Sequence, residues 1–317
     1  MTRMGTKMRS SLSSRSVGSL TGVERQWTVL TILRTTAEFL DERGVPEARL
    51  SAEHLLADVL GCRRLDLYIG FDRPLGPEEV EAYRGRVKRR LAREPVQYIT
   101  GRAGFRGLDL AVDPRVLVPR PETELLVSEV LAWARAEAGR GRVPPGGWRR
   151  VDVGSGSGAI AIALAQELGD VAWVLGTDAS PAALEVARDN ARRVGAHGTL
   201  WAATDGLAAL GTDVKVDAVV ANPPYVADGD RRGLAREVLD WEPAAALFAG
   251  PRGDEHLKRI VDEAPRALRA GGLLALEVGQ GQAPGIRELV RGTAGLEYLA
   301  LYRDHAGIER GVLALAE

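Results

Sequence analysis

The chain has 317 residues, and its content of 45% hydrophobic and 27% charged residues is typical of globular proteins. A formal net charge of -1 excludes a strong overall attraction to nucleic acid or to membrane surfaces. The single cysteine, Cys62, excludes an internal disulfide and a cysteine-based zinc site, and the four histidines lack metal-ligand spacing, so we predict no metal.

The first 22 residues are rich in serine and in basic residues and contain no acidic residue. We predict a disordered tail at residues 1–22, whose composition also fits an organellar transit peptide or an over-extended start. The tail lacks the apolar core of a secretory signal. No apolar run in the chain reaches the roughly 18 residues of a transmembrane helix. We therefore expect a cytoplasmic bacterial protein, or an organellar one only if the tail is a transit peptide.

Residues 23–93 have a helical pattern. Apolar side chains recur there near a period of 3.6 at Trp27, Leu30, Leu33 and Leu40. A further helix is expected from Pro77, where acidic residues precede basic ones as the helix dipole favours. We predict a small all-helical domain. The six basic residues between Arg84 and Arg93 are interpreted as a solvated helix face in preference to a partner-binding patch.

Residues 94–124 form a predicted β-hairpin and linker, because Leu108, Leu110 and Val112 alternate between a glycine and an Asp-Pro pair. Strands and helices then alternate through residues 125–317. This order predicts an α/β domain with a doubly wound, seven-stranded, mostly parallel sheet. The last two strands are expected to form an antiparallel pair at the edge of that sheet.

A glycine-rich turn follows the first strand of the α/β domain. Its residues are Gly154, Ser155, Gly156, Ser157 and Gly158. Glycines in this position let the backbone approach a ligand at a helix N-terminus. Asp152 precedes the turn and could order it or face a cationic ligand, and Asp178 ends the second strand, where an acid can accept from ribose hydroxyls. These features predict a nucleoside cofactor and do not choose between NAD and S-adenosylmethionine.

Asp205 and Gly206 end the third strand. A carboxylate at this rim could reach an adenine amino group, and we include both residues among the predicted cofactor contacts. An ordinary turn at the end of a strand explains Asp205 equally well.

The fourth strand ends in Asn222-Pro223-Pro224-Tyr225. The prolines stop the sheet ladder and stiffen the turn. In a doubly wound sheet this turn should face the glycine turn across the cofactor. A planar –NH2 group then finds two acceptors, the Asn222 side-chain oxygen and a main-chain carbonyl of the proline pair, while the Tyr225 ring can stack on it. Hydride transfer has no use for that arrangement.

Together these motifs resemble class I S-adenosylmethionine-dependent methyltransferases that act on amide or exocyclic amino nitrogen. The stretch from 93 to 127, "REPVQYITGRAGFRGLDLAVDPRVLVPRPETELLV", narrows the resemblance to the HemK/PrmC family of release factor glutamine N5-methyltransferases. The segments "DWEPAAALFAG", "LLALEVGQGQ" and "RDHAGIER" are also similar to that family. The resemblance covers about residues 27 to 317, so residues 23–93 are expected to recognise the substrate and 125–317 to carry the methyltransferase activity.

The resemblance implies that S-adenosylmethionine is the cofactor, S-adenosylhomocysteine the product and the Gly-Gly-Gln glutamine of class 1 release factors the substrate. Asn222 Oδ1 and the Pro223 carbonyl would hold the two amide N–H groups, and Asn222 would have a lesser role at the cofactor. Residues 120–123 would line or close the cofactor mouth, although a helix start explains them equally well, and Glu277 is interpreted as structural. Gly206 departs from relatives that carry an aromatic ring beside the adenine.

Four other functions compete with this interpretation. An amino-methyltransferase for nucleic acid could use the same turn, but the net charge of -1 and the lack of a large base-reading domain oppose it. A ribosomal-protein glutamine methyltransferase shares the turn and differs in the N-terminal domain. The remaining two are an NAD dehydrogenase and a binding module with a vestigial site, in which the helix from Arg84 to Arg93 docks a partner.

Overall fold

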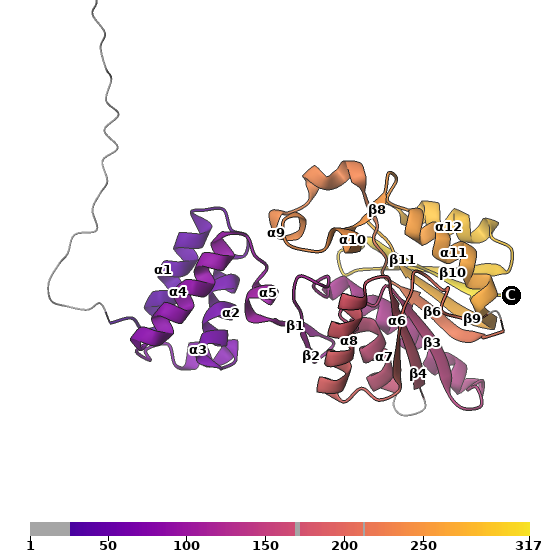
Figure 1. The fold of residues 1–317 in the computed structure, drawn as a ribbon, viewed down its shortest axis with the longest axis horizontal. Helices are drawn as coiled ribbons and strands as arrows, with labels where there is room; N and C mark the ends of the chain where they lie inside the picture. The colour runs from indigo at the N-terminus through magenta and orange to yellow at the C-terminus, as the bar shows by residue number, and fades with distance from the viewer. Residues whose placement is uncertain (1–25, 169–171, 212) are drawn as a thin grey trace, which may run out of the picture.

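A computed structural model describes residues 26–168, 172–211 and 213–317, shown in Figure 1. The predicted tail at residues 1–22 lies outside the described residues. In the described part of the chain no helix has the length and apolar character needed to cross a membrane.

The N-terminal part is helical, as the sequence predicts. Its elements are α1 (Val29–Asp41), α2 (Ala48–Leu60), α3 (Arg64–Ile69), α4 (Pro77–Leu91) and α5 (Val96–Thr100). Pro77 occupies the first turn of α4, followed by two acidic residues, and three basic residues stand in the last turn. Leu55, Leu56 and Tyr83 are fully buried at the centre of this helical unit. The period-3.6 apolar pattern thus became the packed face of the helices.

Arg84, Lys88 and Arg89 are exposed, as a solvated helix face requires, but Arg90 departs from that interpretation. It is only 4% exposed and donates to Ser51 Oγ, to the Pro46 and Glu94 carbonyls and to Glu237 Oε1, the last at 3.2 Å. Arg93 lies 3.3 Å from the same Glu237 oxygen. Because Glu237 belongs to the α/β part, these two arginines join the helical unit to it.

A hairpin and a seven-stranded sheet follow. The strands are β1 (Arg102–Phe105), β2 (Leu108–Ala111), β3 (Trp148–Val153), β4 (Ala172–Asp178), β5 (Thr199–Ala203), β6 (Val216–Ala221), β9 (Leu268–Glu277), β10 (Leu296–Arg303) and β11 (Glu309–Ala316). The sheet order is β10-β11-β9-β6-β3-β4-β5, with β9 to β5 parallel and the β10–β11 pair antiparallel. The predicted hairpin, the doubly wound sheet and the antiparallel edge are confirmed.

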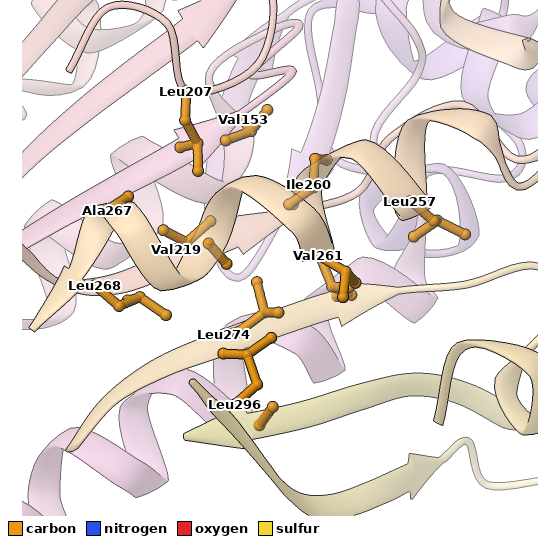
Figure 2. Packing of buried hydrophobic residues seen from close by; sticks show 14 of the residues in the cluster. Val153, Leu207, Val219, Leu257, Ile260, Val261, Ala267, Leu268, Leu274 and Leu296 are labelled. Atoms are coloured by element: carbon orange, nitrogen blue, oxygen red, sulfur yellow. The ribbon is translucent and has the colours of Figure 1, made fainter. Parts of the chain in front are cut away.

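Helices cover both faces of the sheet (Figure 1). They are α6 (Pro121–Gly139), α7 (Ala159–Leu168) and α8 (Pro181–Val194) on one face, and α11 (Glu255–Ala267) and α12 (Ala283–Gly292) on the other. Figure 2 shows Leu257, Ile260 and Val261 of α11 over Val219 of β6 and Leu274 of β9. The sheet is therefore buried on both sides, which leaves its carboxyl edge as the place for a ligand.

Short elements between β6 and α11 were not predicted. They are β7 (Val226–Ala227), η2 (Asp228–Gly233), α9 (Arg236–Leu239), α10 (Ala244–Leu247) and β8 (Phe248–Gly250). Runs of two to six residues are too short to show a helical or strand period. The helix that follows them, α11, ends at Ala267 because Leu268 begins β9.

Arg90→Ala should lower the free energy of unfolding by about 3 kcal/mol, because it leaves a partly buried Glu237 with one partner fewer and removes three further hydrogen bonds. Arg84→Ala on the same helix, whose side chain is 62% exposed, should change it by less than about 0.5 kcal/mol. Urea unfolding of both variants measures the difference. Equal effects would show that Arg90 does not hold the two parts together.

Candidate active site

The glycine turn after β3 is held by β4. The amides of Gly154 and Ser155 both donate to the Thr177 carbonyl at 2.8 Å. Gly154 and Gly156 have φ values of 76° and 53°, and a Cβ on either would meet nothing within 4 Å. A Cβ on Gly158 would lie 2.9 Å from the Trp201 ring. The first two glycines thus keep the open side of the turn clear, and Gly158 permits close packing of α7.

Asp152 orders the turn from below. Its side chain is completely buried, and Oδ2 accepts from the Ala161 amide at 3.2 Å. Burial raises the pKa of Asp152 to about 7, while the nearby Ser155 hydroxyl and the Ala161 amide oppose the rise and the charge of Asp178 adds to it. The Ser155 hydroxyl itself donates to the main-chain carbonyl of Asp152 at 3.0 Å. We expected Asp152 either to order the glycine turn or to face a cationic ligand. Its buried position behind the turn fits the ordering role.

Asp178 lies at the end of β4, with both carboxylate oxygens oriented by backbone amides. Oδ2 accepts from the Gly156 amide at 2.9 Å, and Oδ1 accepts from the Ser180 amide at 2.8 Å. Each carboxylate oxygen can accept more than one hydrogen bond. The carboxylate is therefore held in place and keeps acceptor capacity toward the cavity that it lines.

A cavity of about 210 Å³ lies at the carboxyl ends of the strands. It brings together most of the predicted site residues, namely Gly154, Gly156, Asp178, Asp205, Gly206, Asn222, Pro223 and Pro224. Ser155, Ser157 and Gly158 do not line it, and all three are buried. Two larger hollows, around residues 188–201 and 37–68, lie away from this edge of the sheet.

The rim beside Asp205 differs from expectation, because Arg259 of α11 forms an ion pair with the Asp205 carboxylate. This hydrogen-bonded guanidinium holds the pKa of Asp205 below its ordinary value. A Cβ on Gly206 would lie 2.9 Å from Glu263 Oε2 and 3.1 Å from an Arg259 terminal nitrogen. Glycine at 206 therefore leaves room for these two side chains where the family resemblance implied a ring.

The turn after β6 is fixed on two sides. Asn222 Nδ2 donates to Thr123 Oγ1 at 3.0 Å, which ties the turn to the first turn of α6. On the other side Gln282 Nε2 donates to the Tyr225 and Gly253 carbonyls, both at 3.0 Å. Gln282 Oε1 in turn accepts from the Gly279 amide at 2.9 Å. The Asn222 carboxamide and the Tyr225 backbone therefore occupy defined positions.

Tyr225 lines a second cavity, of about 190 Å³, that shares Leu117 and Ala246 with the first. Its other lining residues are Arg120, Val226, Leu234, Val238 and Leu247. Arg120 Nη2 lies 2.7 Å from both carboxylate oxygens of the buried Glu242. Arg120 lines the second cavity and Thr123 contacts Asn222, while Pro121 and Glu122 begin α6. Residues 120–123 therefore both start a helix and border the site.

The residues that sequence reasoning missed come from other elements. Arg259, His256 and Ile260 of α11 line the first cavity, and Gln282 braces the turn. The three residues of α11 follow the ordinary pattern of an amphipathic helix, which does not mark them as site residues. Of these four residues, only Gln282 carried a signal, because it stands in the segment "LLALEVGQGQ" that resembles the family. The described residues contain no group of acidic, histidine or cysteine side chains that could hold a metal ion.

Comparisons with known proteins cover both parts of the chain. Residues 31–101 match the PrmC N-terminal domain, and residues 144–246 match the methyltransferase small domain. A protein of Geobacter sulfurreducens named release factor glutamine methyltransferase is 42% identical over 286 residues, which are 90% of this chain and 96% of that protein. Its namesake in Chlorobaculum tepidum is 39% identical over 298 residues, 93% and 99% of the two chains.

Among solved structures, a methyltransferase from Pyrococcus furiosus superimposes with a TM-score of 0.47 at 17% identity. The superposition covers 73% of this chain and 98% of that one.

Asp152→Asn should change how stability depends on pH. The raised pKa means that folded Asp152 keeps a proton that the unfolded chain releases between about pH 4 and pH 7, so this residue makes the protein less stable as pH rises through that range. The melting temperature of Asp152→Asn relative to the native protein should therefore increase from about pH 5 to about pH 8. Asp189→Asn, on the exposed face of α8, is the control, and identical trends for both variants would contradict the assignment.

Proposed function

Because the chain belongs to the family of release factor glutamine methyltransferases, we propose that it methylates N5 of the glutamine in the Gly-Gly-Gln tip of a class 1 peptide chain release factor, with S-adenosylmethionine as methyl donor. One observation carries the proposal. The Asn222 carboxamide stands at the carboxyl end of β6, beside the glycine turn of β3, and its oxygen accepts no hydrogen bond within the described residues.

The first cavity fits a nucleoside cofactor. The open faces of Gly154 and Gly156 leave space for a ligand against the backbone, and the oriented Asp178 carboxylate can accept from two ribose hydroxyls. Arg259 and Gly206 would border the adenine end. When bound, S-adenosylmethionine supplies an electrophilic methyl group on a sulfonium and leaves as S-adenosylhomocysteine.

The turn after β6 would hold the substrate amide. An amide nitrogen is a weak nucleophile because its lone pair is conjugated with the carbonyl. Asn222 Oδ1 and the Pro223 carbonyl would accept hydrogen bonds from its two N–H groups, direct the nitrogen toward the cofactor cavity and favour the positive charge that develops on it. As the S–CH3 bond breaks and the N–CH3 bond forms, the nitrogen becomes acidic and loses one of its two protons to water. Positioning is then the main catalytic contribution, and proximity effects reach roughly 7–11 kcal/mol in favourable cases.

The second cavity would admit the glutamine side chain. Its apolar residues Leu117, Leu234 and Leu247 suit a methylene chain, and Tyr225 stands where the ring can stack on the planar amide. A larger hollow of about 340 Å³ shares Arg120 and Val238 with it and is bordered by the helical unit at Ser51 and His54. A release factor loop could therefore contact both parts of the chain as its glutamine enters.

The proposal is tested by methyl transfer from labelled S-adenosylmethionine to a purified release factor. The matched control is the same factor with its Gly-Gly-Gln glutamine changed to alanine. Label on the native factor alone would support the proposal. Label on neither, with label instead on ribosomal protein or nucleic acid, would assign the site to one of those substrates.

Asn222→Ala and Asp178→Ala should have reciprocal effects. Asn222→Ala removes an amide acceptor, so kcat should fall by about 100-fold or more while the cofactor Kd changes only a few-fold. Asp178→Ala removes a ribose acceptor, so the cofactor Kd should rise by about 10-fold or more. Calorimetry and steady-state kinetics separate the two. A large loss of cofactor binding in Asn222→Ala, or unchanged binding in Asp178→Ala, would contradict this division.

A further inference from the structure

The order of the strands sets where the base of a nucleoside cofactor would lie. In the run β6-β3-β4-β5, Asn222 follows β6 and Asp178 ends β4. A ligand with its reacting end at Asn222 and its ribose at Asp178 would therefore extend its base toward the end of β5. Asp205 and Gly206 follow β5, and both line the first cavity. This placement rests on the proposed function, because it takes S-adenosylmethionine as the cofactor.

At this end of the cavity an ion pair holds the flat guanidinium of Arg259. Nη1 donates to Asp205 Oδ2 at 2.5 Å, and Nη2 donates to Oδ1 of the same carboxylate. A bidentate pair of this kind occupies one edge of the guanidinium and neither of its faces. The remaining nitrogen, Nε, is buried and has no hydrogen-bond partner in the described part of the chain. A ligand can therefore cover a face of the guanidinium without breaking a hydrogen bond.

Gly206 places no side chain against this guanidinium. A Cβ at Gly206 would lie 3.1 Å from Nη2 and 3.4 Å from Nε of Arg259, and the φ of 66° also favours glycine. Arg259 lines the first cavity together with His256 and Ile260 of α11, and its side chain is 36% exposed. A planar cation thus borders the space that the strand order gives to the base.

We propose that Arg259 binds the adenine of the cofactor by stacking its guanidinium on the base, and that Asp205 is a positioning residue that holds the guanidinium in place. Guanidinium planes stack on aromatic rings and on the bases of nucleic acids. The attraction between a cation and the face of a ring adds to the stacking. Asp205 then acts on the base through Arg259 and does not itself accept from the adenine amino group.

Variants of Arg259 test the stacking by calorimetry with S-adenosylhomocysteine. Arg259→Ala removes the plane, so the Kd should rise by about 10-fold. Arg259→Lys keeps the charge without the plane and should also bind several-fold more weakly. Lys258→Ala is the control, because Lys258 pairs with Asp254 and does not line the cavity, and it should keep the native Kd. A native Kd in Arg259→Ala, or a loss of binding confined to His256→Ala, would overturn the proposal.

A ligand without a base separates stacking from a general structural role of Arg259. S-ribosylhomocysteine has the ribose and amino-acid parts of S-adenosylhomocysteine and no adenine. Its Kd should therefore be the same for the native protein and for Arg259→Ala. If Arg259 only supported the fold of the cavity, Arg259→Ala would weaken both ligands equally, and that result would overturn the proposal.

A double-mutant cycle tests the role of Asp205. If the carboxylate acts by holding Arg259, Asp205→Ala should raise the Kd of S-adenosylhomocysteine in the native protein and should add no further loss to Arg259→Ala. A direct contact between Asp205 and the adenine amino group would instead lower the affinity in both backgrounds. Additive losses would therefore overturn the positioning role of Asp205.

An NMR measurement without methyl transfer separates this inference from the proposed function. The Nε–H signal of Arg259, assigned by its loss in Arg259→Lys, is recorded with each ligand. A proton over the face of a ring moves to lower frequency, so S-adenosylhomocysteine should shift this signal in that direction and S-ribosylhomocysteine should not. An unmoved signal with S-adenosylhomocysteine bound would refute the inference. A protein that shows the shift yet methylates no release factor would refute only the proposed function, and one that binds no S-adenosylhomocysteine would refute both.

Discussion

The site depends on the register of two parallel strands. β3 and β6 are neighbouring parallel strands, and Val153 pairs with Ala221. The turns that follow the two strands therefore lie side by side at the carboxyl edge of the sheet. The glycine turn begins at Gly154 and the turn proposed to hold the substrate amide begins at Asn222. A one-residue slip of β6 would turn its alternating side chains to the opposite faces of the sheet and move Asn222 along the edge. All six residues of β6 are buried, which holds this register.

Buried acidic groups support the site from behind. Asp152 orders the glycine turn, Glu277 is buried at the end of β9, and Glu242 anchors Arg120 at the second cavity. Burial raises the pKa of each. Unlike the exposed ion pairs on the helices, these carboxyl groups have few partners in a medium of low dielectric constant, so the orientation of each neighbouring group depends strongly on them.

Much of the fold could be predicted because its signals are local. Alternating strands and helices, glycines after β3 and prolines after β6 each act within a few residues of themselves. The family resemblance added the substrate and the role of the amide. What could not be predicted depends on contacts across the chain. Thr123 and Asn222 are 99 residues apart, and Arg259 and Asp205 are 54 apart.

The same limit explains why Arg90 departs from the solvated face expected of its helix. Arg90 stands in a run of charged residues typical of a surface, but it is buried by contacts that lie far along the chain, with Ser51, 39 residues earlier, and with Glu237, 147 residues later. Periodicity along α4 identifies which side faces the helical core but not what lies against the opposite side. The contact between Arg90 and Glu237 matters for the proposed function because both residues line the hollow of about 340 Å³, which adjoins the proposed entry for the glutamine.

The most direct measurement is a crystal structure of this chain with S-adenosylhomocysteine and a release factor. The cofactor product should lie against Gly154 and Gly156 with its ribose on Asp178. The glutamine amide nitrogen should lie at a hydrogen-bonding distance of about 2.7–3.2 Å from both Asn222 Oδ1 and the Pro223 carbonyl oxygen. A glutamine bound away from Asn222, or an Asn222 carboxamide that donates to the substrate with its –NH2 group, would contradict the assignment of the site.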